Sequence, residues 1–208
     1  MPTLEERRAA ELAKYEAIYS DTAKFCHYGS GASDNWQAVW PAICKEKPKL
    51  IADVGTGQGH FPVIMAETFG TKCYACDFAW PGESTKEVNG VTIEYARAPA
   101  HALPWADKSM DWVTSFDVLE HFLPEEVEDC IAEMLRVARV GLFLTVATFP
   151  TSLDIGDTLT ELHPTVRSYL WWWRLLGRLT GDEFGETIEH TVDERLPRHG
   201  FVVRLPNA

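Results

Sequence analysis

The feature that most constrains this chain is an apolar segment, 50–54, that leads directly into three glycines at alternate positions. These are Gly55, Gly57 and Gly59, and the residues that follow, 61–69, have a helix-like pattern. Glycine accepts the left-handed backbone of a tight turn and leaves room where a Cβ atom would collide with a bound molecule. A strand, a glycine turn and a helix in this order predict an α/β fold with a nucleotide-type binding site at the turn.

The spacing of the glycines distinguishes two classes of nucleotide site. The dinucleotide fingerprint of hydride-transfer enzymes would have its third glycine at position 60, which is His60. The chain instead reads Asp-x-Gly-x-Gly-x-Gly, and this pattern resembles motif I of the class I S-adenosylmethionine-dependent methyltransferases. The resemblance implies a Rossmann-like three-layer α/β sandwich with a mostly parallel sheet, and S-adenosylmethionine as cofactor. The motif residues expected to form the cofactor site are Asp53, Gly55, Thr56, Gly57 and Gly59.

The rest of the chain alternates strand-like and helix-like segments, as expected for a doubly wound sheet. The expected strands are 50–54, 71–76, 91–95, 110–115, 140–147 and 201–205, and the expected helices are 61–69, 125–138 and 166–179. We expect one domain made of an N-terminal helical cap with a loop at 28–31 (1–48), a cofactor-binding core (49–150) and a substrate-side helix with the last strand (151–208). The chain ends soon after that strand, which allows a sheet that lacks the family's final strand.

Composition narrows the classes of partner and location. The net charge of −12 argues against a nucleic-acid partner, because such proteins normally present a basic face. No window approaches the length of about 20 apolar residues that a membrane span needs. The charged start of the chain does not look like a targeting signal, so we expect a cytoplasmic protein. We also expect a monomer or a homodimer. Five cysteines then indicate reduced thiols, and the pair Cys73 and Cys76 lies in a strand-like run that favours a structural role over a metal site.

A second acidic residue stands where such folds bind ribose. Asp77 ends the strand-like run that contains the two cysteines, and an acid at that place can accept hydrogen bonds from both ribose hydroxyls. The alternative is that Asp77 only caps the loop before Pro81. The adjacent Phe78 would pack on the adenine face or fill the core, and the sequence does not distinguish these roles.

The segment after the third strand sharpens the resemblance. Leu103-Pro104-Trp105 and Asp111 resemble the corresponding segment of small-molecule methyltransferases of the ubiquinone-biosynthesis type. The chain departs from that group at Pro99, where the group has an Asp that accepts a hydrogen bond from the adenine amino group. Proline offers neither a side-chain acceptor nor an N–H. The resemblance therefore implies that adenine is recognised by backbone groups around Ala100 and His101, or that the pocket is altered.

The end of the fourth strand carries a further family-like segment, Asp-Val-Leu-Glu-His, at 117–121. The resemblance places Phe116 and Asp117 beside the methionine part of the cofactor, at the carboxyl end of the sheet. His121 is a candidate general base, because an unperturbed imidazole titrates near neutrality. It would otherwise order the loop or line the cofactor pocket, since a base must reach the substrate as well as the cofactor.

A second candidate base follows the fifth strand. His163 lies in a polar run before an aromatic helix, where Glu161 could orient its ring toward an acceptor hydroxyl. The alternative is that His163 only precedes the helix, with Pro164 at the first helical position.

Three consecutive tryptophans, 171–173, lie within that expected helix. At 3.6 residues per turn they cannot all face one core. The apolar stripe that we expect to be buried consists of Val166, Leu170 and Trp173, which leaves Trp171 or Trp172 for another surface such as a substrate pocket or a dimer partner.

These patterns predict methyl transfer from S-adenosylmethionine to an oxygen, or less favourably a nitrogen or carbon, of a small molecule or a sugar. The alternative is a methyltransferase-like module that binds the cofactor or serves as a partner subunit without turnover, an interpretation that Pro99 and the short C-terminal segment support. A nucleic-acid or protein methyltransferase is disfavoured, because the sequence has neither a Pro-Cys dipeptide nor an Asn/Asp-Pro-Pro-aromatic segment. Transfer from the sulfonium needs no metal, so we expect no metal site.

Overall fold

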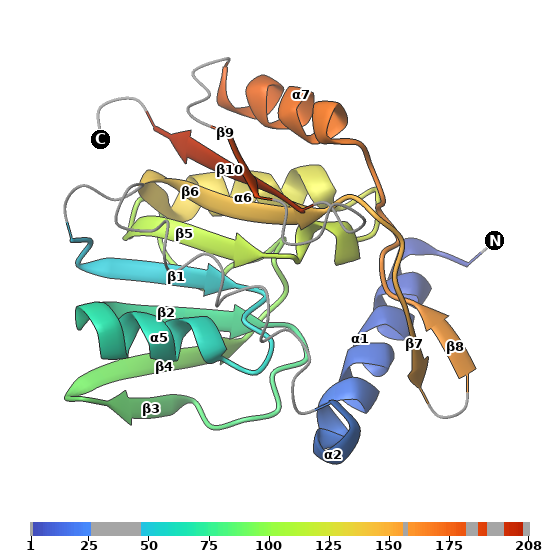
Figure 1. Cartoon of the computed structure of the whole chain (residues 1–208), viewed down its shortest axis with the longest axis horizontal. Helices are drawn as coiled ribbons and strands as arrows, with labels where there is room; N and C mark the ends of the chain where they lie inside the picture. Colours follow the sequence, from blue (N-terminus) through green and yellow to red (C-terminus); the bar gives the residue numbers. More distant parts are fainter. Residues whose placement is uncertain (1, 26–46, 156–157, 182–186, 191–197, 206–208) are drawn as a thin grey trace.

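The computed structural model describes residues 2–25, 47–155, 158–181, 187–190 and 198–205. An eight-stranded sheet forms its centre (Figure 1). The strands, in the order in which they lie side by side, are β3 (Thr85–Val88), β4 (Val91–Arg97), β2 (Lys72–Asp77), β1 (Leu50–Val54), β5 (Met110–Phe116), β6 (Ala138–Ala147), β10 (Arg198–Arg204) and β9 (Thr187–His190). The run from β4 to β6 is parallel, whereas β3, β10 and β9 pair antiparallel with their neighbours. The predicted fold class is confirmed.

The sheet is not shortened at its C-terminal edge. β10 pairs antiparallel with β6 on one side and with β9 on the other. The expectation of a missing last strand was wrong because it looked for a hairpin partner after β10, whereas β9 precedes β10 in the chain. The sequence of β9, Thr-Ile-Glu-His, contains one strongly apolar residue and therefore gives a weak strand signal.

Helices cover both faces of the sheet, because successive strand residues point to opposite sides. On one face, α5 (His60–Phe69) packs Phe61 and Met65 with Ile51 of β1 and Phe143 of β6. On the other face, α6 (Val127–Val137) and α7 (Tyr169–Thr180) pack against alternate residues of the same strands. The buried residues of that face include Ala52, Leu142, Leu144, Ile131, Met134, Trp172 and Leu176. The three layers are therefore two helical layers with the sheet between them (Figure 1).

Cys73 and Cys76 both lie buried in β2 as free thiols, which agrees with a structural role. Burial raises the pKa of both thiols. Within the described residues, no helix has the length and apolar character needed to cross a bilayer.

The described part of the N-terminal cap is α1 (Leu4–Ser20) followed by the single turn α2 (Thr22–Phe25). A capping box begins α1: the Thr3 hydroxyl accepts from the Glu6 N–H at 3.2 Å, and the Glu6 carboxylate accepts from the Thr3 N–H at 2.7 Å. The helix lies beyond the carboxyl ends of the parallel strands, where the arrowheads of β1, β2 and β5 point in Figure 1. The loop expected at 28–31 lies outside the described residues.

The polar run before His163 is a hairpin, not the loop expected from the sequence. β7 (Ser152–Ile155) pairs antiparallel with β8 (Thr158–Glu161), and β7 contacts α1. The strand signal was missed because only Leu153 and Ile155 alternate as apolar residues, and both pack against the cluster around Ile18. The remaining side chains of the hairpin are mostly polar and exposed.

The buried stripe of α7 also differs from the expected one. Trp172, Leu175 and Leu176 face the core, whereas Leu170 and Trp173 are 48% and 40% exposed. The expectation was wrong because it began the helix at 166. Ser168 is the N-cap, and its hydroxyl accepts from the Trp171 N–H at 3.3 Å. Val166 therefore precedes the helix, and the face that packs on the sheet is the one shared by Trp172, Leu175 and Leu176 at spacing i, i+3 and i+4.

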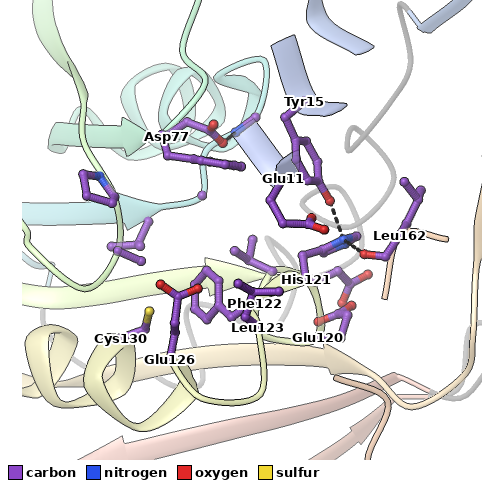
Figure 2. Close-up of a pocket in the computed structure, with 18 of the residues that line it drawn as sticks. Glu11, Tyr15, Asp77, Glu120, His121, Phe122, Leu123, Glu126, Cys130 and Leu162 are labelled. Atoms are coloured by element: carbon purple, nitrogen blue, oxygen red, sulfur yellow. Dashed lines mark hydrogen bonds between the residues drawn. The ribbon is translucent and has the colours of Figure 1, made fainter. Parts of the chain in front are cut away.

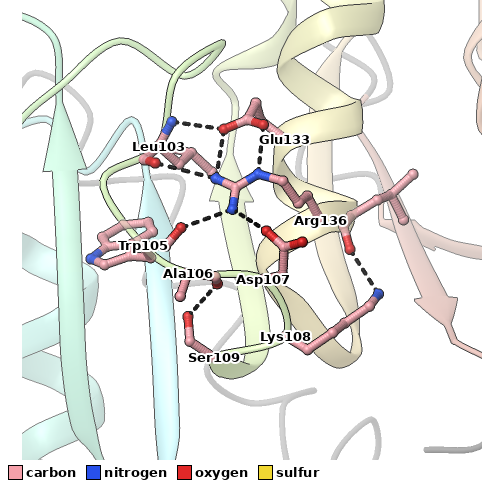
Figure 3. A network of polar contacts seen from close by, with 9 residues as sticks. Leu103, Trp105, Ala106, Asp107, Lys108, Ser109, Glu133 and Arg136 are labelled. Carbon is pink, nitrogen blue, oxygen red and sulfur yellow. Dashed lines mark hydrogen bonds and ion pairs between the residues drawn. The ribbon is translucent and has the colours of Figure 1, made fainter.

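A single arginine of α6 anchors the loop that follows β4 (Figure 3). Arg136 Nη1 donates to the Trp105 carbonyl at 2.9 Å and to Asp107 Oδ1 at 2.7 Å, and Nη2 donates to the Leu103 carbonyl at 3.2 Å. Glu133 accepts from Arg136 Nε at 2.7 Å and from the Leu103 N–H at 3.0 Å. This network fixes the end of the loop whose first residues line the cavity described below.

Replacing Arg136 with Met should lower the free energy of unfolding by about 1–3 kcal/mol, because buried carbonyl oxygens lose a charged donor. Urea denaturation of the two proteins measures this. Arg178→Met is the matched control: among the described residues Arg178 pairs only with the Glu128 carboxylate, on the surface of α6 and α7, so the effect should be smaller. Equal losses in the two variants would show that the loop does not depend on Arg136.

Candidate active site

A cavity of about 760 Å³ lies at the carboxyl ends of β1, β2, β4 and β5, with α1 across it. Its lining includes every site residue expected from the sequence except Asp53 and Gly59. Open α/β sheets bind ligands at this edge, where the chain crosses from β1 to β2 on one side and to β5 on the other. Figure 2 shows Asp77 on one side of the cavity and His121 on the other. The cavity therefore has two ends with different chemistry.

The three glycines of the motif have different roles. All three adopt positive φ, at 73° for Gly55, 56° for Gly57 and 75° for Gly59. A Cβ atom on Gly55 would lie 2.4 Å from Val118 Cγ1, and one on Gly59 would lie 2.9 Å from the Tyr95 ring. Among the described residues, the nearest atom to a Cβ on Gly57 is the Tyr19 hydroxyl at 3.8 Å. Gly57 therefore leaves the open space, whereas the other two permit close packing.

Asp77 lies buried at the end of β2 and accepts three hydrogen bonds. Its Oδ2 accepts from the Gly57 N–H at 3.1 Å and from the Tyr19 hydroxyl at 3.2 Å, and its Oδ1 accepts from the Ala79 N–H at 2.9 Å. Burial is the largest effect on this carboxyl and raises its pKa to about 6, although the three hydrogen bonds oppose the shift. Two donors come from the backbone, and the third is the side chain of a residue on α1.

Asp53, in contrast, does not line the cavity. It is buried in β1, and its Oδ1 accepts from the Thr114 hydroxyl at 2.8 Å. Burial raises the pKa of Asp53 to about 7, with the hydrogen bond from Thr114 acting in the opposite direction. In this structure Asp53 joins β1 to β5, and Gly59, which also does not line the cavity, packs against Tyr95.

The loop after β4 carries Pro99, Ala100 and His101 along the cavity wall. Its backbone is held at both sides: the Ala98 N–H donates to the Asp77 carbonyl at 3.2 Å, and the Ala102 N–H donates to the Pro99 carbonyl at 3.1 Å. Phe78 also lines the cavity and meets the Tyr15 ring edge-on at 5.3 Å between centroids. It thus faces the cavity and packs against α1 at once.

His101 extends the wall toward α6. Its Nδ1 lies 3.6 Å from Glu126 Oε1, and the same carboxylate pairs with Arg8 of α1. A second ion pair also joins α1 to the loop before α6. In this pair, Arg7 Nη2 lies 2.8 Å from Glu125 Oε1. These contacts hold the N-terminal half of α1 over this end of the cavity.

Asp117 lines the cavity beside Phe116, but its carboxylate is already occupied. Oδ1 accepts from the Thr145 hydroxyl at 2.8 Å, and Oδ2 accepts from Arg198 Nε of β10. The Asp117 N–H donates to Thr145 as well, at 2.9 Å to its hydroxyl. Arg198 was not identified from the sequence, because nothing local marks a residue of the last strand as the partner of an acid after β5.

His121 closes the far end of the cavity in the 3₁₀ turn η1 (Leu119–His121). Its Nδ1 lies 2.8 Å from the Leu162 carbonyl and 2.6 Å from the Tyr15 hydroxyl (Figure 2). Burial, followed by the nearby His163, lowers the pKa of His121 to about 3. The ring is therefore neutral at neutral pH. The structure brings it into contact with the second candidate, since the two imidazole centroids are 4.6 Å apart at an angle of 89°.

His163 lies in the segment after β8 with its Nδ1 2.6 Å from the Phe149 carbonyl. Donation of the Nδ1–H to this carbonyl leaves a free lone pair on Nε2. Burial lowers the pKa of the ring. The carbonyl takes the place that the sequence assigned to Glu161. That side chain is exposed, and its residue contributes a backbone carbonyl that accepts from Lys14 Nζ at 3.2 Å.

Glu120 is the site residue that the sequence reasoning missed. Glu120 lies in η1 next to His121. Its side chain is fully buried but lines the cavity, and its Oε1 accepts from the Ala147 N–H at 3.0 Å. Its Oε2 has no hydrogen-bond partner among the described residues. Burial, and then the carboxylate of Asp117, raise the pKa of Glu120 well above its ordinary value. The signal was present in the Asp-Val-Leu-Glu-His segment, but only the histidine was considered.

The sequence of the core matches that of a known family. Residues 52–145 match the profile described as a methyltransferase domain. These residues form a class I methyltransferase domain. The demethylmenaquinone methyltransferase of Thermus thermophilus is 31% identical over 126 residues, which cover 58% of this chain and 56% of that protein. The chain spans about half the length of the curated relatives it matches.

Solved structures share the fold of this methyltransferase domain over most of the chain. The 1,6-didemethyltoxoflavin-N1-methyltransferase of Burkholderia thailandensis, crystallised with 1,6-didemethyltoxoflavin and S-adenosylhomocysteine, has a TM-score of 0.71 and 14% identity, with 99% of this chain and 91% of that chain covered. The magnesium protoporphyrin IX methyltransferase of Synechocystis PCC 6803, solved with bound S-adenosylmethionine, has a TM-score of 0.60 and 20% identity, with 84% and 80% covered. At these identities, the likeness is one of fold.

The different roles of the glycines predict different stability losses. Gly55→Ala should lower the free energy of unfolding by about 3 kcal/mol or more, because the methyl group overlaps Val118 and the backbone is left-handed. Gly57→Ala should cost about 1–2 kcal/mol, since only the backbone term applies. Thermal unfolding of both variants measures the difference. Val118→Ala in the Gly55→Ala background should restore part of the loss; no restoration would contradict the proposed overlap.

Proposed function

We propose that this protein transfers the methyl group of S-adenosylmethionine to an oxygen atom of a small molecule or a sugar. The observation that carries the proposal is one continuous cavity that joins the glycine turn and Asp77 to the paired imidazoles of His121 and His163. The first end has the features of a nucleoside site, and the second has candidate bases. Relatives that match the chain, described above by name, support methyl transfer but differ in acceptor.

The nucleoside part of the cofactor fits the end formed by β1, β2 and the loop after β4. Asp77 already accepts a hydroxyl hydrogen bond there, from Tyr19, and the ribose hydroxyls would donate to the same carboxylate. Gly57 leaves space for close approach of the ligand to the backbone. Pro99 provides no side-chain acceptor, so adenine would meet the wall formed by Ala100 and His101. The methionine part would then point toward Phe116 and η1.

The chemistry asks little of the protein. A lone pair of the acceptor oxygen attacks the methyl carbon as the carbon–sulfur bond breaks, and the bonding pair stays on sulfur, which becomes the neutral thioether of S-adenosylhomocysteine. The protein must hold the two atoms within about 3–3.5 Å of each other and keep water out. A hydroxyl acceptor also loses its proton, which requires a base or another means of activation.

The acceptor end of the cavity favours a hydroxylated molecule with an apolar part. His163 and His121 supply the polar groups, while Phe149, Leu153 and Leu162 supply apolar walls. His163 is the better candidate to take the proton, because its Nδ1 faces the Phe149 carbonyl and leaves Nε2 available, whereas the pKa of His121 is lowered to about 3. The net charge of −12 disfavours a nucleic acid as acceptor.

A second candidate function is cofactor binding without turnover, as a partner subunit. Pro99 favours this alternative, because adenine recognition departs from that of the group the sequence resembles. The two functions are distinguished by a methyl-acceptor screen: both bind S-adenosylmethionine, but only the enzyme produces S-adenosylhomocysteine in the presence of an acceptor.

The ribose role of Asp77 predicts both an affinity and its pH dependence. Asp77→Asn should weaken S-adenosylhomocysteine binding by about 1.5–3 kcal/mol, the usual contribution of hydrogen bonds to a charged group. Because the pKa of Asp77 is raised to about 6, lowering the pH through 6 protonates the carboxyl and should weaken binding to the unsubstituted protein but not to the variant. Calorimetry from pH 5 to 8 measures both effects.

The raised pKa of Asp77 also makes the stability of the free protein depend on pH, in the direction opposite to that of ligand affinity. The folded-state pKa of Asp77 lies above its ordinary value of 3.8, so its contribution favours folding at pH 4 and is lost as the pH rises through about 6. Tyr19→Phe is the matched control for binding, since it removes one donor but keeps the carboxylate, and it should retain the pH dependence. A flat affinity profile for the unsubstituted protein would contradict the ribose role.

The acceptor end predicts an effect on turnover. His163→Ala should lower turnover by about 10²–10⁴ with little change in S-adenosylhomocysteine affinity, because activation of the acceptor is lost and the cofactor end is untouched. Methyl uptake by hydroxylated metabolites and sugars, followed as S-adenosylhomocysteine release, is the measurement. Glu161→Gln is the control and should leave turnover unchanged, since that side chain points to solvent. Full turnover of His163→Ala from pH 6 to 9 would make the imidazole structural.

A further inference from the structure

Three side chains with metal-binding chemistry converge on the acceptor end of the cavity. They are Glu120 and His121 of η1 and His163 of the segment after β8, and one donor atom from each lies within 4.8 Å of the others. All three line the cavity. Glu120 and His121 are neighbours in the sequence, whereas His163 lies more than forty positions later. Folding therefore brings His163 to the other two residues.

Both imidazoles are held from behind by backbone carbonyls. His121 Nδ1 lies 2.8 Å from the Leu162 carbonyl, and His163 Nδ1 lies 2.6 Å from the Phe149 carbonyl. Proteins orient metal-binding histidines in this way, because a hydrogen bond from Nδ1–H fixes both the ring and its tautomer. The Tyr15 hydroxyl, 2.6 Å from His121 Nδ1, can accept from the same N–H. With the proton on Nδ1 in both rings, each Nε2 carries the lone pair that a metal requires.

The carboxylate of Glu120 has an open position. Oε1 accepts from the Ala147 N–H at 3.0 Å, which orients the group, whereas Oε2 has no hydrogen-bond partner among the described residues although the whole side chain is buried. A buried carboxylate oxygen without a donor is costly and is normally paired with a charge or coordinated to a metal. The neighbouring cation, Arg198, is engaged by Asp117 through its Nε.

We propose that Glu120, His121 and His163 bind a divalent transition-metal ion of the Zn²⁺ type, with open coordination positions toward the cavity. Two imidazoles and one carboxylate make up a ligand set that such ions use in catalytic sites, where a water molecule or the substrate takes the free position. The ligand set also excludes Mg²⁺ as the preferred ion, since Mg²⁺ favours oxygen ligands and retains water.

The spacing of the donors fits a site that tightens on binding. Ligand atoms about 2.1 Å from a tetrahedral ion lie about 3.4 Å apart. The donors here lie within 4.8 Å of one another, so a small rotation of the side chains brings them into range.

This inference rests on the proposed function and refines it, because it names the group that activates the acceptor. A metal ion that binds the acceptor hydroxyl lowers its pKa, so that the proton is released to solvent and the oxygen attacks the methyl carbon. His163 then acts as a ligand and not as a free base. The sequence predicts no metal because transfer from the sulfonium itself needs none, but activation of an acceptor hydroxyl has its own requirement.

Direct metal binding tests the proposal without any assay of activity. The full chain, stripped with a chelator, should bind one equivalent of Zn²⁺ in calorimetry, on the order of 100-fold more tightly than Mg²⁺. Co²⁺ at the same site should give visible absorption bands that Zn²⁺ abolishes. Glu120→Gln and His163→Gln should each weaken Zn²⁺ binding by more than the 10–100-fold known for outer-shell partners, roughly 100-fold or more.

Two matched variants control for general effects. Glu161→Gln changes an exposed carboxylate near the same hairpin, and His101→Gln changes an imidazole at the opposite end of the cavity. Both should bind Zn²⁺ as the unsubstituted protein does. A cooperative thermal unfolding transition shows that each variant is folded, and if one ligand variant fails to fold the other decides the outcome. No Zn²⁺ binding, or equal binding by all the variants, overturns the metal site.

Activity of the stripped protein separates the two proposals. Loss of methyl transfer on chelation and its return with Zn²⁺ would support the metal site. Full methyl transfer by the stripped protein that still depends on His163 would overturn the metal site and leave the proposed function in place, with His163 as a free base. A protein that binds Zn²⁺ but transfers no methyl group to any hydroxylated acceptor would overturn the proposed function alone.

Discussion

The parallel pairing of β1 with β2 and β5 determines the form of the rest of the molecule. Because the chain leaves β1 toward one neighbour and later returns on the other side, the turn after β1 and the loops after β2 and β5 diverge at the carboxyl edge of the sheet. The space between them is the cavity. Gly55 lets Val118, after β5, pack against this turn, because a Cβ atom at position 55 would overlap the Val118 side chain. The site is thus a consequence of strand order before any catalytic residue is considered.

Helix α1 converts that edge of the sheet into an enclosed site. Ion pairs fix it to the loop before α6, and Arg97 at the end of β4 pairs with Glu16. These are surface pairs of modest individual strength. The apolar contribution comes from Ile18, which is fully buried, and from the β7–β8 hairpin packed against it. The cap therefore depends on a small apolar cluster, with charged pairs setting its orientation.

Local sequence patterns predicted those features of the fold that depend on neighbouring residues in the chain. The glycine turn, the acid at Asp77 and the parallel core were predictable because backbone freedom, strand periodicity and turn chemistry are properties of neighbouring residues. What failed depends on long-range packing. Glu161 was chosen to orient His163 because it is close in sequence, whereas the Phe149 carbonyl is close in space. Arg198 gave no local signal, and the role of Glu120 within its family-like segment depends on partners on other elements. The weak β9 was missed for the same reason: its stability comes from pairing with β10.

Helix α1 contacts both ends of the cavity with two tyrosines one helical turn apart. Tyr19 donates to Asp77 at the nucleoside end, and Tyr15 meets the His121 ring at the other end. A helix transmits displacement along its length as a rigid rod, and four residues span about 6 Å. A nucleoside that displaced Tyr19 would therefore also shift the phenol beside His121. Binding at one end would then change the binding affinity at the other end. By linkage, the coupling free energy is the same in both directions. The helix that encloses the two ligands would also make their affinities interdependent.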